Sequence, residues 1–387
     1  MSILHLMLML PLGVGVTHSQ DQTVSGVPPQ ISRVRPCFLI CDKMSALISI
    51  IFPMIRIAIN GFGRIGRTTL RAMTSRKGVQ VVAINDLTDP ATLAYLLKHD
   101  SVFRTWSSAV KAGKDFLEVD GVKIPVYAQK DPALLPWKEL KVDVVIESTG
   151  FFRKDVDARK HIVAGAKKVV ISAPSEDTPT FLMGVNHGKC KKSDDIVNNA
   201  SCTTNSAAPV AQILEDAIGV KKAMLTTIHS VTASENLVDG IPSKKDDLRI
   251  GRSAMVNMIP TSTGAAKATT TVVTSLKDKF DGISVRVPSL DVSLTDFTFL
   301  MKRNTTVEEI NTIFKTAAKS ARWKGILDVT NEPLVSTDFI GSPFGSVVDL
   351  DLTRVVDGDL VKVLAWYDNE WGYTQRLVDM AVHVGKL

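Results

Sequence analysis

Apolar and polar residues change their spacing several times along the chain, and each change predicts a new element. Residues 55–59 alternate and are β-branched, which is typical of a strand, and a helical pattern follows them. The strands predicted in this half are 55–59, 79–84, 142–147 and 168–172, and the helices are 67–76, 90–99 and 155–164. Because strands alternate with helices, we expect a parallel, doubly wound sheet with ligands at the carboxyl ends of its strands.

The pattern is different after residue 202. An Ala- and Leu-rich helix is predicted over 206–216, and a capping box formed by Thr306 and Glu309 begins another helix. The strands predicted here are 222–229, 284–287, 291–301 and 360–367, and an amphipathic helix over 371–384 closes the chain. Long strands with segregated helices predict an α+β domain on an antiparallel or mixed sheet. The segment 230–259 shows little periodicity, and we interpret it as a polar segment with a function or an interface.

Residues 1–53 do not share the pattern of the rest. Their apolar runs, 3–16 and 46–52, are shorter than the ~18–20 residues that span a bilayer. We expect this segment to be disordered or to stem from a misassigned translation start. A targeting segment and an ordered structural element are the alternatives.

Composition narrows the class of protein. The formal net charge is +6 and the basic residues are spread along the chain, which favours small anions over nucleic acid as partners. Four cysteines form no disulfide framework, so we expect a reducing, cytoplasmic compartment and no membrane association. The seven histidines show no zinc spacing, and no metal site is predicted.

Three glycines follow the first strand at once. Gly61, Gly63 and Gly66 form a G-x-G-x-x-G between strand and helix, and Asp86 lies twenty residues beyond the last of them. In a Rossmann-like fold, such glycines allow a tight turn, close approach of a pyrophosphate and helix packing. A carboxylate at Asp86 accepts ribose hydroxyls and repels a 2′-phosphate, which favours NAD over NADP. A plain tight turn and an ordinary turn aspartate are the alternatives.

Cys202 lies among small and hydroxyl residues, at the start of the helix predicted after it. A helix N-terminus stabilises a thiolate, so Cys202 is a candidate nucleophile. His229 ends a predicted strand and is the candidate base. The alternatives are a buried structural cysteine and a structural histidine.

Four motifs together give a resemblance. They are INGFGRIGR at 59–67, ASCTTN at 200–205, PTSTGAAK at 260–267 and WYDNEWGY at 366–373. On these motifs, residues 54–387 resemble phosphorylating glyceraldehyde-3-phosphate dehydrogenases. The resemblance implies an NAD-binding domain over 54–201, a catalytic domain over 202–366 and a C-terminal helix, 367–387, that returns to the NAD-binding domain.

The resemblance also implies a reaction. The Cys202 thiolate attacks the aldehyde of glyceraldehyde 3-phosphate, hydride passes to the nicotinamide, and inorganic phosphate cleaves the resulting thioester, with His229 as base. It implies a substrate-phosphate site at Thr232 and Arg286. The implied ligands of the attacking phosphate are Ser201, Thr203, Arg252, Thr263 and Gly264, and those of NAD are Gly61, Phe62, Gly63, Arg64, Ile65, Gly66, Asp86, Lys130, Thr149, Asn369 and Tyr373.

The chain departs from the family pattern at several positions. Ser206 replaces a second cysteine, Phe103 and Arg104 replace a His-Gly pair, and Lys130 replaces an arginine near the adenine. Pro242 resembles the NAD-using form. Erythrose-4-phosphate dehydrogenase and a non-catalytic binding protein remain the alternatives, whereas the motifs do not favour aspartate-semialdehyde dehydrogenase. The resemblance further implies a glycolytic homotetramer with the loop 232–257 at an interface.

Overall fold

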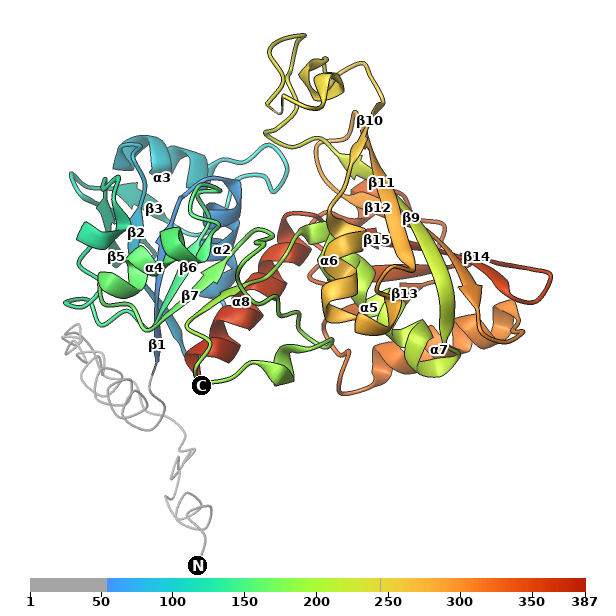
Figure 1. The fold of residues 1–387 in the computed structure, drawn as a ribbon. Helices are drawn as coiled ribbons and strands as arrows, with labels where there is room; N and C mark the ends of the chain where they lie inside the picture. Colours follow the sequence, from blue (N-terminus) through green and yellow to red (C-terminus); the bar gives the residue numbers. More distant parts are fainter. Residues whose placement is uncertain (1–53, 244) are drawn as a thin grey trace, which may run out of the picture. The chain divides into compact units, whose positions relative to one another are not determined.

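The computed structural model describes residues 54–243 and 245–387, which build two β-sheets with helices against them (Figure 1). The segment 1–53, for which we expect disorder or a misassigned start, lies outside these residues. None of the helices in the described ranges is long and apolar enough to cross a bilayer.

The first sheet has eight strands in the order β3-β4-β5-β2-β1-β6-β7-β8. Their bounds are β1 Ile55–Asn60, β2 Val79–Asn85, β3 Val110–Ala112, β4 Phe116–Val119, β5 Val122–Tyr127, β6 Val144–Glu147, β7 Lys168–Ile171 and β8 Ile196–Asn198. From β5 to β8 the neighbours are parallel, and β3 and β4 form an antiparallel edge. The chain leaves β1 toward β2 on one side and reaches β6 on the other, which makes the carboxyl end of β1 a topological switch point.

Helices cover both faces of this sheet, so its central strands are apolar on both sides. The helices are α2 Arg64–Thr74, α3 Pro90–Lys98, α4 Asp155–Val163 and the C-terminal α8 Trp371–Gly385. Ile57 and Ile59 of β1 pack with Leu70 of α2 and Leu377 of α8 in one core cluster. Ala58 faces the opposite way, into the cluster that contains α4.

The second sheet has seven strands in the order β10-β11-β9-β12-β15-β14-β13. Their bounds are β9 Val220–Ser230, β10 Ile259–Ser262, β11 Phe280–Val287, β12 Ser293–Met301, β13 Leu327–Thr330, β14 Ser346–Val356 and β15 Leu360–Tyr367. Parallel pairs join β11 to β9 and β13 to β14, and the remaining pairs are antiparallel. The sheet is therefore mixed, and the predicted combination of an α/β dinucleotide-binding half with an α+β half is confirmed.

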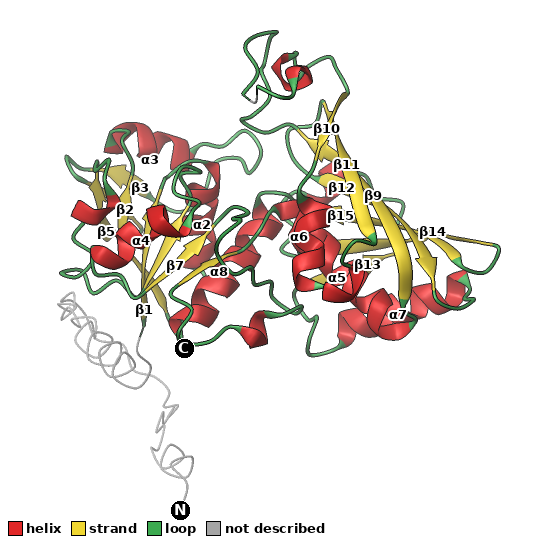
Figure 2. Ribbon diagram, in the orientation of Figure 1, coloured by secondary structure: helices red, strands yellow, loops and turns green. Residues whose placement is uncertain are grey.

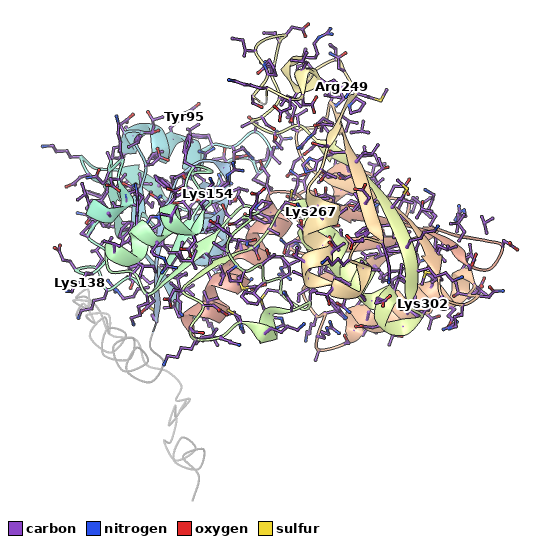
Figure 3. All side chains as sticks on the ribbon, viewed as in Figure 1. Tyr95, Lys138, Lys154, Arg249, Lys267 and Lys302 are labelled. Carbon is purple, nitrogen blue, oxygen red and sulfur yellow. The ribbon has the colours of Figure 1, made fainter. Side chains whose placement is uncertain are left out.

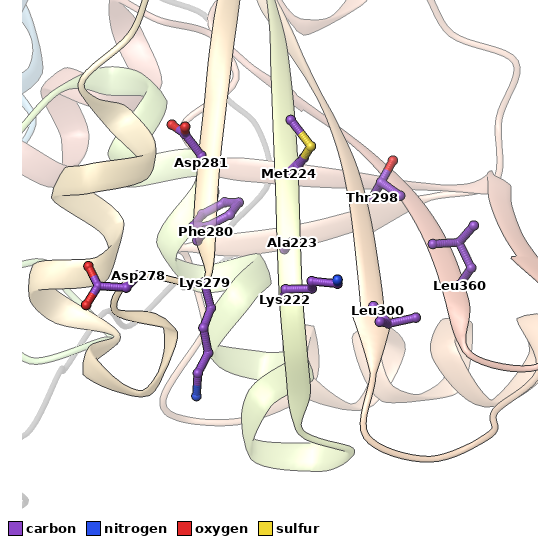
Figure 4. A pocket seen from close by; sticks show the side chains of 10 residues that line it. All are labelled: Lys222, Ala223, Met224, Asp278, Lys279, Phe280, Asp281, Thr298, Leu300 and Leu360. Carbon is purple, nitrogen blue, oxygen red and sulfur yellow. The ribbon is translucent and has the colours of Figure 1, made fainter.

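Three helices pack on this sheet: α5 Cys202–Ala217, α6 Ala265–Val272 and α7 Val307–Lys319. The predicted N-cap begins α7, since Thr306 Oγ1 accepts the N–H of Glu309 at 3.2 Å. The Glu309 carboxylate accepts hydrogen bonds from Arg303 and from the Thr305 hydroxyl, so it does not close the predicted capping box. Away from the helices the sheet carries exposed Met224, Ile283 and Leu360. A hollow of about 690 Å³ lies at one end of the strands. Figure 4 shows the side chains that line it: Lys222, Ala223, Met224, Asp278, Lys279, Phe280, Asp281, Thr298, Leu300 and Leu360.

The segment between β9 and β10 is a long loop with one short 3₁₀ turn, Leu248–Gly251, drawn mostly as loop in Figure 2. This segment is polar in composition, but our interpretation overlooked its apolar residues. It exposes a set of apolar side chains: Leu237, Val238, Ile241, Leu248, Met255, Val256 and Met258. Arg249 lies in the same loop, and Lys267 lies on α6 beneath it (Figure 3). The segment shows no periodicity because these apolar residues lie in a loop and not in a regular helix or strand.

Candidate functional site

A cavity of about 560 Å³ contains both predicted reactive side chains. It is lined by Arg64, Ile65, Ser101, Val102, Ser148, Ser172, Ala173, Pro174, Ala200, Ser201, Cys202, His229, Val231, Thr232, Ala233, Leu290, Asn369, Glu370 and Tyr373. These residues come from the strand ends of the first sheet, the start of α5, the end of β9 and the start of α8. The larger hollow on the second sheet holds neither a cysteine nor a histidine, so the chemistry points to this cavity.

Cys202 is the first residue of α5, as predicted, and the helix begins four residues before the predicted boundary. Ser201 caps the helix, because its Oγ accepts the N–H of Thr204 at 3.1 Å. Ala200 has a φ of 52°, in the left-handed region, which turns the chain sharply into the helix. The Cys202 Sγ lies 3.4 Å from His229 Nε2, within hydrogen-bonding distance for sulfur.

His229 is buried, with 4% of its surface exposed, and its Nδ1 has two neighbours. The carbonyl oxygen of Ser230 lies 2.7 Å from Nδ1 and can accept a hydrogen bond from Nδ1–H. Arg286 Nη1 lies 2.6 Å from the same nitrogen and can donate to it. Because Arg286 pairs with His229 across β11 and β9, the sheet register brings the guanidinium to the ring. The tautomer of His229 therefore decides which neighbour it uses.

Desolvation disfavours the charged forms of both reactive side chains. Desolvation, helped by the charge of Arg286, lowers the pKa of His229 to about 3. Desolvation also raises the pKa of the Cys202 thiol, although Arg286 and the N–H groups at the start of α5 oppose this. The N–H groups at the start of α5 lower the pKa of the Cys202 thiol, as predicted, but the loss of water around the sulfur raises it by more.

Asn369 follows β15 and is fixed by two hydroxyls. Ser230 Oγ donates to Asn369 Oδ1 at 2.9 Å, and Ser293 Oγ donates to it at 2.8 Å. With the oxygen held in this way, the amide NH₂ is the side that a ligand can use. Tyr373 lies nearby in the cavity wall, and its hydroxyl donates to the carbonyl of Ala200 at 3.2 Å.

The glycine motif turns between β1 and α2. Gly61 has a φ of 90°, and a Cβ there would lie 2.6 Å from the backbone nitrogen of Thr149. A Cβ on Gly66 would lie 2.2 Å from the carbonyl oxygen of Gly61. Gly63 is the N-cap of α2 and no side chain caps the helix, while a Cβ on Gly63 would meet nothing within 4 Å. Open space thus lies at an uncapped helix N-terminus, which fits the pyrophosphate of a dinucleotide.

Polar contacts hold the rest of this crevice. Asp86 Oδ2 accepts the N–H of Phe62 at 2.7 Å, so the carboxylate lies beside the glycine turn. Below the turn, Glu147 Oε1 accepts the N–H of Thr149 at 2.8 Å, and His161 Nε2 lies 3.0 Å from Glu147 Oε2. These contacts order the ends of β1, β2 and β6, where the ribose and pyrophosphate of a dinucleotide would lie.

Arg64 joins the crevice to the C-terminal segment. Its Nη1 donates to Asp100 Oδ2 at 3.0 Å, and its guanidinium also forms a two-pronged pair with Glu370. Glu370 is the neighbour of Asn369 in sequence, so this pair ties the start of α2 to the residue that resembles a nicotinamide ligand. The side chain of Arg64 is committed to these two carboxylates.

Substitutions at Gly66 and Gly63 can separate folding from cofactor binding. We expect Gly66→Ala to destabilise the protein by about 1–3 kcal/mol, because its methyl group overlaps a backbone carbonyl. Gly63→Ala should change the free energy of unfolding by less than ~0.5 kcal/mol, because Gly63 has a φ of −68° and open space around it. The variant should nevertheless bind NAD weakly, because its methyl group enters the space that would hold the pyrophosphate. Thermal melts and NAD titration by calorimetry check both. Parental NAD affinity in Gly63→Ala would contradict the assignment of this space.

Other predicted site residues lie outside the cavity lining. Thr203 is buried, and its hydroxyl lies 2.9 Å from that of Tyr367. Arg252 is exposed in the long loop and its Nε donates to Asp239 at 2.8 Å. Lys130 is exposed after β5. Thr263 and Gly264 precede α6.

Two carboxylates were not predicted. Glu235 contacts both Thr232 and Arg286, and the Thr-x-x-Glu spacing of a capping box was its only signal in the sequence. Asp291 is 3% exposed beside Asp368, and neither of its carboxylate oxygens has a hydrogen-bond partner among the described residues. Desolvation and the charges of Asp368 and Glu370 raise the pKa of Asp291 well above its usual range. No local sequence pattern predicts that Asp291 and Asp368 lie together.

The raised pKa of Asp291 predicts a pH dependence of stability. The folded state keeps Asp291 protonated, while the unfolded chain ionises it. The contribution of Asp291 to the free energy of unfolding is therefore fully present below about pH 4 and is lost as pH rises toward the pKa of the folded state. Asp291→Asn removes the titrating group, and we expect it to gain ~2 kcal/mol over the parent at pH 8 but little at pH 4. Melting temperatures across pH 4–9 would check this. Asp115→Asn, at an exposed position, is the control, and parallel profiles for parent and Asp291→Asn would contradict the idea.

A switch-point crevice with a glycine turn, and a cysteine–histidine pair in a cavity beside it, are typical of a dinucleotide-dependent enzyme. Comparison with known proteins agrees. The family model described as "Glyceraldehyde 3-phosphate dehydrogenase, NAD binding domain" matches residues 55–155, and the one described as "Glyceraldehyde 3-phosphate dehydrogenase, C-terminal domain" matches residues 201–369. The chain belongs to the glyceraldehyde-3-phosphate dehydrogenase family and is an NAD-dependent oxidoreductase.

Curated relatives match over almost their whole length. Glyceraldehyde-3-phosphate dehydrogenase of Zymomonas mobilis is 49% identical over 336 residues, which cover 86% of this chain and 99% of the relative. Glyceraldehyde-3-phosphate dehydrogenase 1 of Bacillus cereus is 50% identical over 333 residues, covering 86% and 98%. Glyceraldehyde-3-phosphate dehydrogenase 1 of Saccharomyces cerevisiae is 46% identical, covering 86% and 100%.

Proposed function

We propose that this enzyme oxidises glyceraldehyde 3-phosphate with NAD and inorganic phosphate, and forms 1,3-bisphosphoglycerate. The observation that carries the proposal is the 3.4 Å approach of Cys202 Sγ to His229 Nε2 in the cavity beside the dinucleotide crevice. The reaction needs a nucleophile, a base and two anion sites within reach of a nicotinamide. The residues around this cavity offer candidates for all of them.

Cys202 is the proposed nucleophile and His229 the proposed base. When Nδ1–H donates to the Ser230 carbonyl, Nε2 presents its lone pair to the thiol and can take the proton. The guanidinium of Arg286 then opposes a positive charge on the ring, and this is one cause of the low pKa of His229. A substrate phosphate bound at Arg286 would offset that charge. Substrate binding would therefore raise the basicity of His229 at the moment when it is needed.

The Cys202 sulfur adds to the aldehyde carbon, and the carbonyl oxygen becomes the hydroxyl of a thiohemiacetal. Bound NAD supplies a hydride acceptor at this carbon. His229 removes the hydroxyl proton as hydride leaves, which gives a thioester on Cys202. Phosphate then attacks the thioester carbon and the thiolate leaves. Asn369 would orient the nicotinamide, and the N–H groups at the start of α5 face the site where negative charge develops on oxygen.

We assign the two anions to different parts of the chain. Thr232 and Arg286 are proposed for the substrate phosphate, and the group Ser201, Thr203, Arg252, Thr263 and Gly264 for the attacking phosphate. Thr203 would act through its backbone, because its hydroxyl is engaged with Tyr367. Arg252 would have to leave Asp239, so a movement of the long loop is part of this assignment.

The same proposal includes a homotetramer, a cytoplasmic location and a role in glycolysis. It also includes the division of the chain into an NAD-binding domain, 54–201, a catalytic domain, 202–366, and a C-terminal helix, 367–387. The apolar side chains of the long loop support an interface role for it, since exposed patches of this kind mark sites of association. A relative from Chlamydomonas reinhardtii, 46% identical, is named as the cytosolic enzyme.

The test is NADH formation at 340 nm with glyceraldehyde 3-phosphate, with and without inorganic phosphate, and with erythrose 4-phosphate in parallel. Phosphate-dependent turnover that prefers the triose is the expected result. Preference for the tetrose would assign the chain to erythrose-4-phosphate oxidation. Absence of turnover with either aldehyde would contradict the proposal and favour a non-catalytic binding protein.

A further inference from the structure

One carboxylate contacts both residues proposed for the substrate phosphate. Glu235 Oε2 accepts the backbone N–H of Thr232 at 2.8 Å and its hydroxyl at 3.1 Å. Glu235 Oε1 accepts the hydroxyl of Ser234 at 2.8 Å and lies 3.5 Å from Arg286 Nε. The side chain of Glu235 is only 2% exposed, so this is a buried negative charge beside a guanidinium.

The guanidinium of Arg286 is incompletely satisfied. Its Nη1 donates to the Ser230 carbonyl at 3.1 Å and lies against His229. Its Nε is buried and makes no hydrogen bond to any part of the chain that the structure describes. A buried donor without an acceptor is costly. The Oε1 of Glu235 is close enough to compensate the charge but does not complete the hydrogen bond, which leaves Nε as a donor for an incoming anion.

A phosphate at this place would compete with Glu235. It would take hydrogen bonds from Thr232, which the carboxylate already uses, and from Arg286 Nε, which lies 3.5 Å from the same carboxylate. Two negative charges a few ångströms apart at a partly buried site repel by an amount comparable with a strong ion pair. The carboxylate therefore both orders the subsite and weakens the attraction of Arg286 for anions.

We propose that Glu235 sets the affinity and specificity of the substrate-phosphate subsite. It holds Thr232 and Arg286 in position before substrate binds, and its charge lowers the affinity for any phosphate ester that contacts them. The identity of the substrate rests on the proposed function, whereas the charge argument applies to any small phosphate ester. Glu235 is a positioning residue in this scheme and takes no part in bond making.

The kinetic test uses Glu235→Gln, which keeps an acceptor for Thr232 and removes the charge. We expect its KM for glyceraldehyde 3-phosphate to fall about tenfold with kcat within ~3-fold, and kcat/KM for unphosphorylated glyceraldehyde to stay within ~2-fold of the parent. Glu235→Asp retains the charge and should keep a KM within ~3-fold of the parent. Glu332→Gln makes the same charge change at an exposed position and serves as the matched control. An unchanged or raised KM in Glu235→Gln, or equal effects on both aldehydes, would overturn the proposal.

A binding test does not depend on turnover. The rate of Cys202 alkylation by iodoacetamide is followed by mass spectrometry of its peptide at increasing glycerol 3-phosphate, a phosphate ester without an aldehyde. The half-protecting concentration should be about tenfold lower in Glu235→Gln than in the parent. If the shift occurs but no aldehyde is oxidised, the proposed function fails and the role of Glu235 stands. If aldehyde is oxidised and no shift occurs, only the role of Glu235 fails.

Discussion

Replacement of Cys202 by serine should abolish aldehyde oxidation, with NADH formation reduced by roughly 10⁴-fold or more. The reason lies in the nucleophile and in the intermediate. A serine hydroxyl stays protonated at neutral pH, and an oxygen ester transfers its acyl group to phosphate less readily than a thioester. The measurement is the initial rate at 340 nm under saturating NAD, aldehyde and phosphate.

The same variant should bind NAD as the parent does. The glycine turn, Asp86 and the Arg64–Glu370 pair contribute no contact to the sulfur, so calorimetric titration should give an unchanged dissociation constant. Cys190→Ala is the matched control, since Cys190 is buried away from the cavity lining, and it should retain most of the activity. Turnover by Cys202→Ser near the parental rate would show that another group carries the covalent step.

Replacement of His229 by asparagine should reduce kcat by roughly 10²–10⁴-fold. The amide keeps a polar group near Arg286 and Ser230 but cannot take a proton from the thiol or from the hydroxyl of the adduct. Alkylation of Cys202 by iodoacetamide should persist, more slowly at neutral pH, because the thiol then ionises without a base 3.4 Å away. The alkylation rate across pH 5–10 is the measurement.

His383→Asn provides the comparison for that profile. His383 contacts the carbonyl of His187 and does not line the cavity, so its replacement should leave the alkylation profile unchanged. A His229→Asn profile that overlays the parent would remove His229 from the proposed role. A loss of kcat without any change in the profile would instead limit its role to a step after sulfur attack.

Some elements with regular patterns could be predicted from the sequence, whereas the long strand β14 was missed. The spacing of Thr306 and Glu309 places the start of α7 correctly, and β15 has the predicted bounds. The strands β3, β4 and β5 were missed because they are short, because a charged residue interrupts each of them, and because they depend on pairing with neighbouring strands. The helix α2 begins at Arg64, inside the glycine motif, because the loop ends sooner than the apolar period suggests.

The site was predictable where a motif carries the chemistry and unpredictable where tertiary contacts do. Local sequence predicted that Cys202 begins a helix, and the family resemblance paired it with His229. The neutral state of the pair arises from burial by distant segments, and no local pattern reports it. The same holds for Glu235, which lies in the loop after β9, whereas its partner Arg286 lies 51 positions farther along the chain on β11.

The place of α8 has a consequence for how the protein is made. Val378, Ala381 and Val384 of this C-terminal helix complete the core cluster that contains β1, at the start of the described chain. A ribosome therefore releases the whole dinucleotide-binding half, and then the whole second sheet, before the segment that closes the first core emerges. The nascent first half therefore waits with an uncovered apolar face until the fifteen residues of α8 emerge, and such a face favours aggregation or chaperone binding during synthesis.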